Sequence, residues 1–477
     1  LDLARIGLPR LKSHRLLDLV RAFDLPLSTH RADADVEATC AVLPVLLAAI
    51  ASMPAPLVAL IAGFATPEEW STQVVFGYFN QQNEKAAAAQ GETVPRFSLR
   101  GTRREAVSAC DLKSRVDAET LADDPLVGIK APSQEEIAAA FSEDGLVGGL
   151  YQQFERRDEQ CQMSCAVGKA FEQSENLVVE AGTGVGKSMA YLLPAALLAK
   201  KNNITVGVAT KTNALLDQLI YHELPLLDKA LGGLTYAALK GFSHYPCLRK
   251  IEHLVAEHQF DRMLGDKQTT CAVAAAALLS FIEQSEYSDI DTLKIDYRLL
   301  PRWSITCGSQ ECLRRKCPYY GASCFVHGSR RKAAAADIVV TNHSLLFCDL
   351  AADGGLLPPI RYWVVDEAHG AEQEARKAFS SKLSSEELVN IAHKVASDDS
   401  RNIFARVQRR AAVTKDESQE NLLYALTGKA FSAGKEFDEA VKEYVPQVKE
   451  LLYYDTARNK NYEFVDLWIN DEVRKGQ

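Results

Sequence analysis

A glycine-rich segment at residues 181–188, AGTGVGKS, has the residue types that bind phosphate. It follows a short apolar run, expected to be a strand, and precedes a long helical pattern. Strand, loop and helix in this order form a P-loop, whose glycines let backbone N–H groups turn toward phosphate oxygens. The Lys would reach the β- and γ-phosphates and the Ser would bind Mg²⁺. The predicted nucleotide-binding residues here are Ala181, Gly182, Thr183, Gly184, Val185, Gly186, Lys187 and Ser188.

A second apolar run, RYWVVDEAH at residues 361–369, contains two adjacent carboxylates. A P-loop enzyme needs one carboxylate to hold the metal ion and another to activate water. We expect Asp366 to bind Mg²⁺ through water, and Glu367 to orient or deprotonate the water that attacks the γ-phosphate. Acidic pairs after strands are often only solvated, but a P-loop in the same chain favours catalysis. Lys187, Asp366 and Glu367 are therefore the candidate catalytic residues.

Three cysteines lie close together in the segment CLRRKCPYYGASC, residues 312–324. Their gaps do not match the paired short spacings of a zinc ribbon, and three thiolates leave a tetrahedral site one ligand short. A fourth ligand would come from elsewhere in the chain, and spacing alone allows Cys307. A zinc site or unligated thiols are the alternatives to a metal cluster.

The cysteine segment is basic, although the whole chain is acidic. The formal net charge is −9, whereas residues 302–332 hold seven Lys or Arg and one acidic residue, Glu311. A local balance of +6 is large enough to meet a phosphate backbone.

The elements that position these residues must belong to a chain of several domains. Its 477 residues suggest about three domains, and its 47% hydrophobic and 25% charged residues are typical of a soluble globular protein. We find no run of about eighteen apolar residues and no N-terminal signal pattern, so we expect no membrane segment and a cytoplasmic location. Eleven cysteines, an odd number, favour reduced thiols. Because the sequence begins with Leu1, we expect it to be a fragment.

AGTGVGKS together with VVDEAH resembles the superfamily 2 helicases, and Ala181 in place of the first glycine is typical of the helicase form of the loop. Further motifs between residues 145 and 379 are similar to the DinG/XPD branch of iron–sulfur DNA helicases. One is ADIVVTNHSLL, residues 336–346, the motif most specific to that branch. FERRDEQCQM, residues 154–163, resembles the Q-motif, in which Arg157 and Gln160 would contact the adenine side of ATP. TVGVATKT, residues 205–212, resembles motif Ia, in which Thr210 and Thr212 would contact the DNA backbone.

The resemblance also implies a [4Fe–4S] cluster held by four cysteines. In that family the first ligand follows a stretch like LKGFSHYPC at residues 239–247, which favours Cys247 over Cys307. The implied ligands are therefore Cys247, Cys312, Cys317 and Cys324. Arg314, Arg315 and Lys316 would offset the negative charge of the cluster and bind DNA phosphates.

HRADAD at residues 30–35 is similar to the third motif of DnaQ-like, DEDDh-type exonucleases. In such a site His30 would deprotonate water and Asp35 would bind a metal ion. HxAxxD alone is a weak signal, and a two-metal site needs three further carboxylates from earlier motifs, which this sequence lacks. We therefore expect a nuclease remnant without activity.

The fold that the resemblance implies is α/β: a RecA-like P-loop motor lobe with a parallel sheet, an inserted Fe–S domain and part of a helical arch domain. The expected parts are an exonuclease-like end (1–50), a connector (51–144), the motor lobe (145–242 and 333–380), the Fe–S domain (243–332) and the partial arch (381–477). In the connector, the basic stretch at residues 96–104 is expected to be a solvated face.

The resemblance implies an ATP-dependent DNA helicase of 5′–3′ polarity that acts in DNA repair or replication, with ATP, Mg²⁺ and the [4Fe–4S] cluster as cofactors. Single-stranded and forked DNA are the expected partners of a monomer, and the sequence does not identify a protein partner. We find no Q..GR..R pattern after His369, so we expect a second motor lobe to be missing and hydrolysis to be weak. The alternatives are a 3′–5′ exonuclease with an ATP-regulated accessory lobe and a zinc-containing nucleic-acid-binding module without motor activity.

Overall fold

The computed structural model describes residues 1–26, 32–107, 129–150, 155–256, 268–380, 385–396, 403–411 and 417–453. The chain divides into two compact units, Leu1–Phe379 and Ser380–Gln477. The first unit holds the sheet and the cysteine segment, and the second is helical where it is described.

The described strands of the first unit form one four-stranded sheet, in the order β2-β3-β1-β4. All neighbouring strands are parallel, with Val208 opposite both Val340 and Val364. The central strand β1 is buried along its whole length, as expected for a parallel sheet covered on both faces. The predicted α/β class with a parallel sheet is therefore confirmed. The strands are β1 (Val206–Thr210), β2 (Tyr236–Ala238), β3 (Ile338–Asn342) and β4 (Tyr362–Val365).

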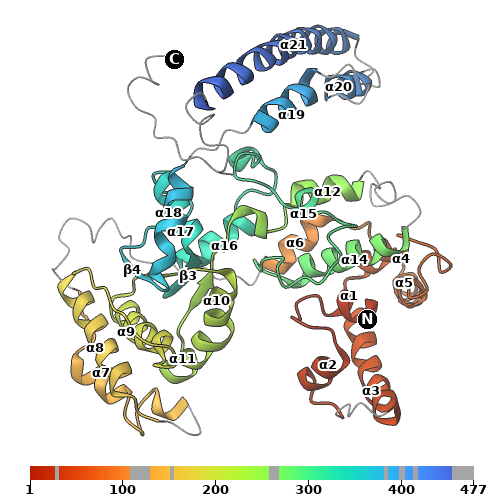
Figure 1. Cartoon of the computed structure of the whole chain (residues 1–477). Helices are drawn as coiled ribbons and strands as arrows, with labels where there is room; N and C mark the ends of the chain where they lie inside the picture. The colour runs from red at the N-terminus through yellow and green to blue at the C-terminus, as the bar shows by residue number, and fades with distance from the viewer. Residues whose placement is uncertain are drawn as a thin grey trace. The chain divides into compact units, whose positions relative to one another are not determined.

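Helices cover both faces of this sheet, because alternate strand residues point to opposite sides. Val206, Val208 and Val340 join a core with the almost wholly buried α9, whereas Ala209 and Val339 join a second core with α17. Figure 1 shows these helices around the strands β3 and β4. The helices of this part are α7 (Gln134–Ala140), α8 (Asp158–Gln173), α9 (Lys187–Asn202), α10 (Asn213–Gln218), α11 (Leu224–Leu231), α16 (Phe325–Ala334), α17 (His343–Ala351) and α18 (Ala371–Phe379), with the short turns η2 (Gly148–Leu150), η3 (Leu219–Glu223) and η7 (Ala368–Gly370).

The apolar run before the P-loop does not form the predicted strand. Residues 175–182 have no regular secondary structure, and none of the four described strands pairs with them. Val178 is 95% exposed, and Leu177 and Val179 are exposed as well. An extended segment becomes a strand only when a neighbour satisfies its backbone N–H and C=O groups, and local sequence cannot supply that neighbour.

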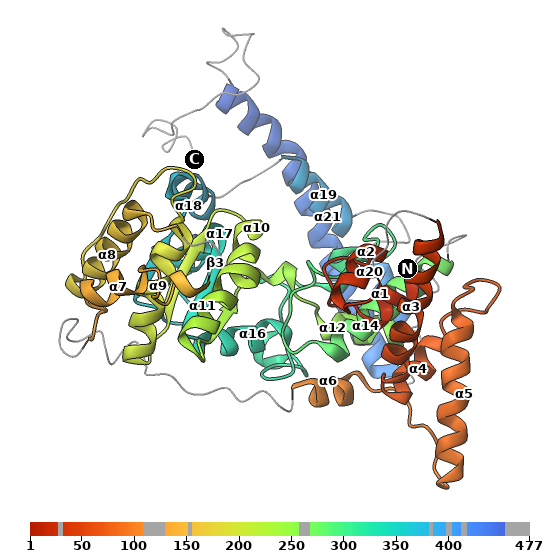
Figure 2. The same cartoon turned by 90° about the horizontal axis from the view of Figure 1, so that it is seen from below.

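The N-terminal helices and the cysteine region share a hydrophobic core. Ile6, Ile50 and Leu57 belong to the same buried cluster as Leu278 and Phe281 of α14. Figure 2 shows α1, α12 and α14 grouped together. Residues 51–107 therefore contribute buried side chains to this core. The helices here are α1 (Asp2–Gly7), α2 (Leu16–Ala22), α3 (Ala32–Ala51), α4 (Ala55–Ala62), α5 (Gln73–Ala89), α6 (Leu99–Val107), α12 (Leu248–Ala256), α14 (Gln268–Gln284) and α15 (Arg302–Ile305), with the short turns η4 (Phe242–His244) and η6 (Arg314–Lys316).

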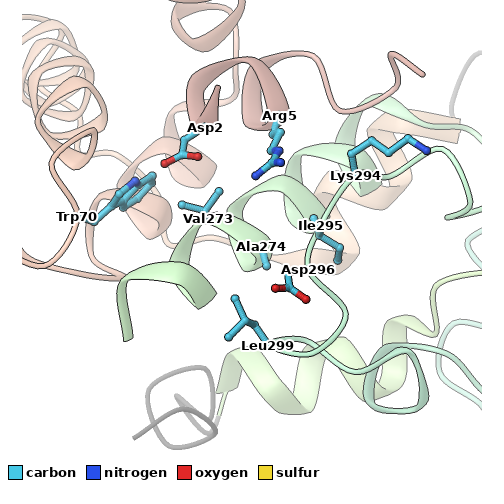
Figure 3. Close-up of a pocket in the computed structure, with 9 residues that line it drawn as sticks. All are labelled: Asp2, Arg5, Trp70, Val273, Ala274, Lys294, Ile295, Asp296 and Leu299. Carbon is cyan, nitrogen blue, oxygen red and sulfur yellow. The ribbon is translucent and has the colours of Figure 1, made fainter. Parts of the chain in front are cut away.

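A small cavity of about 150 Å³ lies where α1 meets α14. Figure 3 shows Asp2 and Arg5 of α1 on one side and Asp296 on the loop beyond α14 on the other, with Trp70 beside Asp2. Lys294 also lines the cavity, so its walls carry charges of both signs. The junction between the N-terminal helices and α14 is therefore polar at this point, although apolar side chains form most of the shared core.

Helix α3 bears on the expectation that the chain has no membrane segment. By length and composition alone, Ala32–Ala51 is apolar enough to cross a membrane. Asp33, Asp35 and Pro44 interrupt its apolar pattern. In the structure Ala38, Val42, Leu46 and Ile50, each one turn from the next, lie buried on one face of the helix and join hydrophobic cores.

The second unit is helical over its described residues, as its charge-rich pattern predicts. Helix α21 (Glu417–Tyr453) packs against both α19 (Ser385–Ala396) and α20 (Ile403–Ala411). The rings of Phe404 and Phe431 meet edge to face at 6.5 Å. The assignment of this unit to an arch domain stays a prediction.

Candidate nucleotide site and cysteine pocket

The glycine-rich loop has the geometry of a phosphate site at the start of a long helix. Gly184 and Gly186 have φ angles of +84° and +82°, a region that favours glycine. Gly186 caps α9, and Lys187 is the first residue of that helix. The first N–H groups of a helix have no partner within it, and together with the helix dipole they attract anions.

Two side chains of the predicted Q-motif donate hydrogen bonds to the backbone of the glycine-rich loop. The amide Nε2 of Gln160 donates to the carbonyl of Gly186 at 2.8 Å, and the guanidinium of Arg157 donates to the carbonyl of Gly184. A Cβ atom on Gly186 would displace the Gln160 amide, and the positive φ of Gly186 also favours glycine. Contact of Arg157 and Gln160 with adenine stays a prediction, and Phe154, the first residue of that motif, lies outside the described residues.

The structure brings the predicted catalytic residues together. Lys187 Nζ lies 3.5 Å from Glu367 Oε1, which joins the P-loop to the segment after β4. Glu367 has a φ of +53°, and its backbone N–H donates to Asp366 Oδ1 at 3.0 Å. Asp366 and Glu367 therefore turn into the site directly after the strand, as expected.

Tyr191 links the two predicted Mg²⁺ ligands, and the sequence interpretation did not include it. Its phenol donates to Asp366 Oδ2 at 3.1 Å and hydrogen-bonds the side chain of Ser188. Burial and the negative charge of Asp366 raise the pKa of Tyr191, so the phenol stays protonated and can donate. Its position three residues after Ser188, on the same helix face, is the signal that could have identified it.

Two histidines and one lysine extend the site beyond the predicted residues. His343, fully buried, places Nε2 2.8 Å from the carbonyl of Asp366. His369 Nδ1 lies 3.3 Å from Glu367 Oε2, and its Nε2 lies 3.1 Å from Lys211 Nζ. A chain of polar contacts thus runs from the segment after β1 to the candidate catalytic carboxylate. The signal was present, because Lys211 and His369 lie inside the motifs already recognised.

The two threonines predicted to contact DNA have different environments. Thr210 is fully buried, and its hydroxyl donates to the carbonyl of Thr212 at 3.1 Å. Its hydroxyl is therefore covered in this structure, and contact of Thr210 with DNA stays a prediction. Thr212 is exposed and caps α10 by accepting from the N–H of Leu215 at 3.3 Å. A role for Thr212 in DNA binding stays a prediction.

Five cysteines line one pocket. The backbone N–H of Cys247 donates to Ile305 at 2.7 Å, and Pro246 pairs with Thr306 in an antiparallel bridge. This pairing brings the two segments that carry Cys247 and Cys307 side by side. The pocket is lined by Cys247, Cys307, Cys312, Cys317 and Cys324.

The thiols of this pocket lie near one another in a poorly solvated place. Burial, together with the nearby Cys247 and Cys312, raises the pKa of Cys307 to about 12. Burial also raises the pKa of Cys324, although backbone N–H groups at the start of α16 oppose the shift. Among the residues that the structure describes, no group of three or more His, Cys, Asp or Glu converges on one metal position.

The predicted basic residues lie on the surface beside this pocket. Arg314, Arg315 and Lys316 form the exposed turn η6 between Cys312 and Cys317. The backbone N–H of Arg314 donates a hydrogen bond to Cys312 Sγ, with 3.4 Å between the nitrogen and the sulfur. The side chains are therefore free of the hydrophobic core and available to solvent.

No known protein-family model matches the chain. It is 34% identical over 264 residues to the ATP-dependent DNA helicase YoaA of Haemophilus influenzae, and 35% identical over 270 residues to the ATP-dependent helicase DinG of Mycobacterium tuberculosis. The chain is related to the DinG-type helicases. Each of these matches covers 54% of the chain and 40% of the relative.

A third relative extends the DinG-type similarity along more of the chain. The 3′-5′ exonuclease DinG of Bacillus subtilis is 26% identical over 389 residues, which are 81% of this chain and 39% of that protein. The chain thus spans about 40% of the length of the curated relatives it matches.

The predicted nuclease remnant is described only in part. His30 lies outside the described residues, and Asp35 lies in the first turn of α3. The structure therefore does not show whether His30 and Asp35 come together.

A buried ion network joins the part of the chain that carries the P-loop to the cysteine region. The side chain of Lys240, just after β2, is 1% exposed and lies 3.1 Å from Asp217, 3.2 Å from Asp289 and 3.0 Å from Asp291. Asp291 also accepts a hydrogen bond from Arg302, and its carboxylate lies within hydrogen-bond distance of His244 Nδ1. Asp217 belongs to α10, whereas Asp289 and Asp291 follow α14.

The charges of this network are strongly coupled. Burial opposes ionisation of Asp291, but contacts with His244, Arg302 and Lys240 outweigh it and hold the pKa of Asp291 well below its usual range. Burial raises the pKa of Asp289. Because the pKa of Asp291 is lower in the folded than in the unfolded protein, the ionised carboxylate stabilises the fold above the ordinary carboxyl pKa. This stabilisation is lost as the pH falls from there toward the lower pKa that Asp291 has in the folded protein.

We expect Lys240→Met to lower the free energy of unfolding by about 3–5 kcal/mol, because three carboxylates would lose their buried cation. Urea unfolding of both proteins at pH 7 measures the difference. Lys332→Met is the matched control, since Lys332 forms a half-exposed pair with Glu286 that should contribute less than about 1 kcal/mol. A Lys240 variant as stable as the control would show that the network adds nothing to stability.

Proposed function

We propose that this chain provides the ATP-binding lobe of a DinG-type DNA helicase. The observation that carries the proposal is the meeting of the P-loop with the acidic segment after β4, through the Lys187–Glu367 pair and the contacts of Tyr191 with Ser188 and Asp366. The DinG and YoaA relatives, named as ATP-dependent helicases, support it.

The residues of the site have distinct roles in ATP hydrolysis. The N–H groups at the start of α9 and the ammonium of Lys187 hold the β- and γ-phosphates. Ser188 and Asp366 would hold Mg²⁺, which would supply positive charge to the phosphates. Glu367 orients or deprotonates the attacking water, and His369 and Lys211 fix the direction of its carboxylate.

The cysteine pocket fits a [4Fe–4S] cluster, with Cys312, Cys317 and Cys324 as ligands and Cys247 as the fourth. A cluster binds each thiolate through a different iron, so its ligands surround a volume instead of converging on one point. The five cysteines that line one pocket support this proposal. The cluster would supply electron-transfer capacity and a rigid link between the cysteine segments.

The DNA partner that this surface suits is single-stranded or forked DNA. The exposed cations of η6 offer contacts to phosphates beside the pocket. The 5′–3′ polarity, the action of a monomer, the cytoplasmic location, and the Fe–S and arch domains are parts of the same proposal. Strand-displacement and degradation assays on the complete protein that contains this chain test it: ATP-dependent unwinding supports a helicase, whereas digestion without unwinding favours the exonuclease alternative suggested by the Bacillus relative's name.

Replacing Arg314, Arg315 and Lys316 by Gln should weaken single-stranded DNA binding and make it less salt-dependent. Each phosphate contact releases counterions, so losing three contacts should reduce the slope of log K against log salt by about 2. Fluorescence anisotropy with an oligonucleotide at several salt concentrations measures this slope. Lys85→Gln, on the exposed surface of α5, serves as the control. An unchanged slope in the triple variant would remove η6 from the DNA interface.

A further inference from the structure

Arg103 of α6 is fully buried and contacts groups far from it in the sequence. Its Nε donates to the carbonyl of Ser323 at 2.9 Å, and its terminal nitrogens donate to the carbonyls of Ser285 and Glu286. The guanidinium also lies over the ring of Phe325, 3.8 Å from its centre. Because Ser323 and Phe325 flank Cys324, one arginine fixes the backbone and the ring on either side of that cysteine. The expected solvated face at residues 96–104 is therefore wrong at Arg103.

Arg100, nearly one turn earlier on the same helix, contacts the other end of this cysteine loop. Its guanidinium lies 5.4 Å from the ring centre of Tyr319, and its Nε lies 3.9 Å from Glu252 of α12. Tyr319 follows Cys317 by two residues and lines the cysteine pocket. Helix α6 thus touches the segment between Cys317 and Cys324 near both of its ends.

The contacts of Arg103 are costly to replace. A buried cation is tolerated only when its donors are satisfied, and the planar guanidinium fork matches several carbonyls at once. Tyr287 holds the same loop from another side, since its hydroxyl donates to the carbonyl of Ala322 at 2.8 Å. The Tyr287 ring packs against Gly328, where a Cβ would collide with it. The backbone before and after Cys324 is therefore held from two directions.

We propose that α6 is a strap that positions Cys317 and Cys324 as cluster ligands, with Arg103 as its main positioning residue. The inference rests on the proposed [4Fe–4S] cluster. It assigns the helix before the ATP-binding lobe to the same functional part as the cysteines, which lie more than 200 residues further along the chain. The physical reason is that a thiolate leaves its iron when its loop moves, and the strap limits that movement.

The test compares Arg103→Met with Arg104→Met, because Arg104 is an exposed cation next to Arg103 on the same helix. All proteins are purified without oxygen, and iron per chain, visible absorbance and the rate of iron release to a chelator are measured. We expect Arg103→Met to release iron about tenfold faster or to retain little iron, and Arg104→Met to match the wild type. Arg103→Lys, which keeps the charge but not the fork, should release iron at an intermediate rate, a graded response that simple misfolding would not give.

Nucleotide binding, which belongs to a separate core, is measured on the same samples to report folding. Iron release at the wild-type rate from Arg103→Met would overturn the strap. If Arg103→Met does not fold, Arg100→Gln decides: its side chain is 58% exposed, and we expect a two- to threefold faster release. An unchanged rate in that variant would also overturn the proposal. Wild-type protein without iron would instead reject the cluster itself, so the two failures can be told apart.

Discussion

Lys187→Ala is expected to weaken ATP binding at least about a hundredfold. Lys187 is the first residue of α9 and carries a cationic side chain, whereas the rest of the loop offers backbone donors to the phosphates. Losing a charge-assisted contact to two phosphates should cost about 2.7 kcal/mol or more of binding free energy. Titration with a fluorescent ATP analogue in the presence of Mg²⁺ measures the affinity.

Two variants separate binding from folding and from chemistry. Lys200→Ala changes an exposed lysine of the same helix, which contacts the carbonyl of Gly232, and should bind ATP like the wild type. Glu367→Gln should keep binding but lose hydrolysis, since the amide cannot accept a proton from water. The Lys187–Glu367 pair is about one-third exposed, so breaking it should change folding stability by less than about 1 kcal/mol. Equal ATP affinity of Lys187→Ala and the wild type would remove Lys187 from the nucleotide site.

Changing Cys247, Cys312, Cys317 or Cys324 to Ser is expected to abolish an oxygen-sensitive brown chromophore. Each thiolate binds a different iron, so the loss of one exposes that iron and destabilises the fold around it. Iron content and visible absorbance of proteins purified without oxygen measure the effect. Cys348→Ser is the control, because Cys348 is exposed and lies outside the pocket.

Cys307 distinguishes the two possible ligand sets. It lies in the same pocket as Cys247, because the bridge between Pro246 and Thr306 aligns their segments. We expect Cys307→Ser to keep the colour, since the family motif places the first ligand at Cys247. Full iron retention in Cys247→Ser with loss in Cys307→Ser would move the fourth ligand to Cys307. Zinc in place of iron would reject the cluster.

The sequence determined features whose physics is local. Positive φ angles favour glycine at positions 184 and 186, and Lys187 follows them directly at the start of a helix. Residues adjacent in the sequence are therefore enough to predict a phosphate site. Asp366 and Glu367 were predictable for the same reason, because they end an apolar strand. The parallel sheet was expected from the resemblance to helicases, and parallel strands need crossover connections such as the helices found here.

The tertiary structure decided which residues meet across long stretches of chain. Arg103 could not be told from its exposed neighbours by sequence, because its burial depends on carbonyls of the distant loops at residues 285–286 and 323. The shared pocket of Cys247 and Cys307 required the pairing of two separate segments. Residues 177–180 have a sequence typical of a strand, yet they pair with none of the four described strands. Local sequence determines the conformation that a segment favours, whereas burial and pairing depend on a partner that only the fold can place beside it.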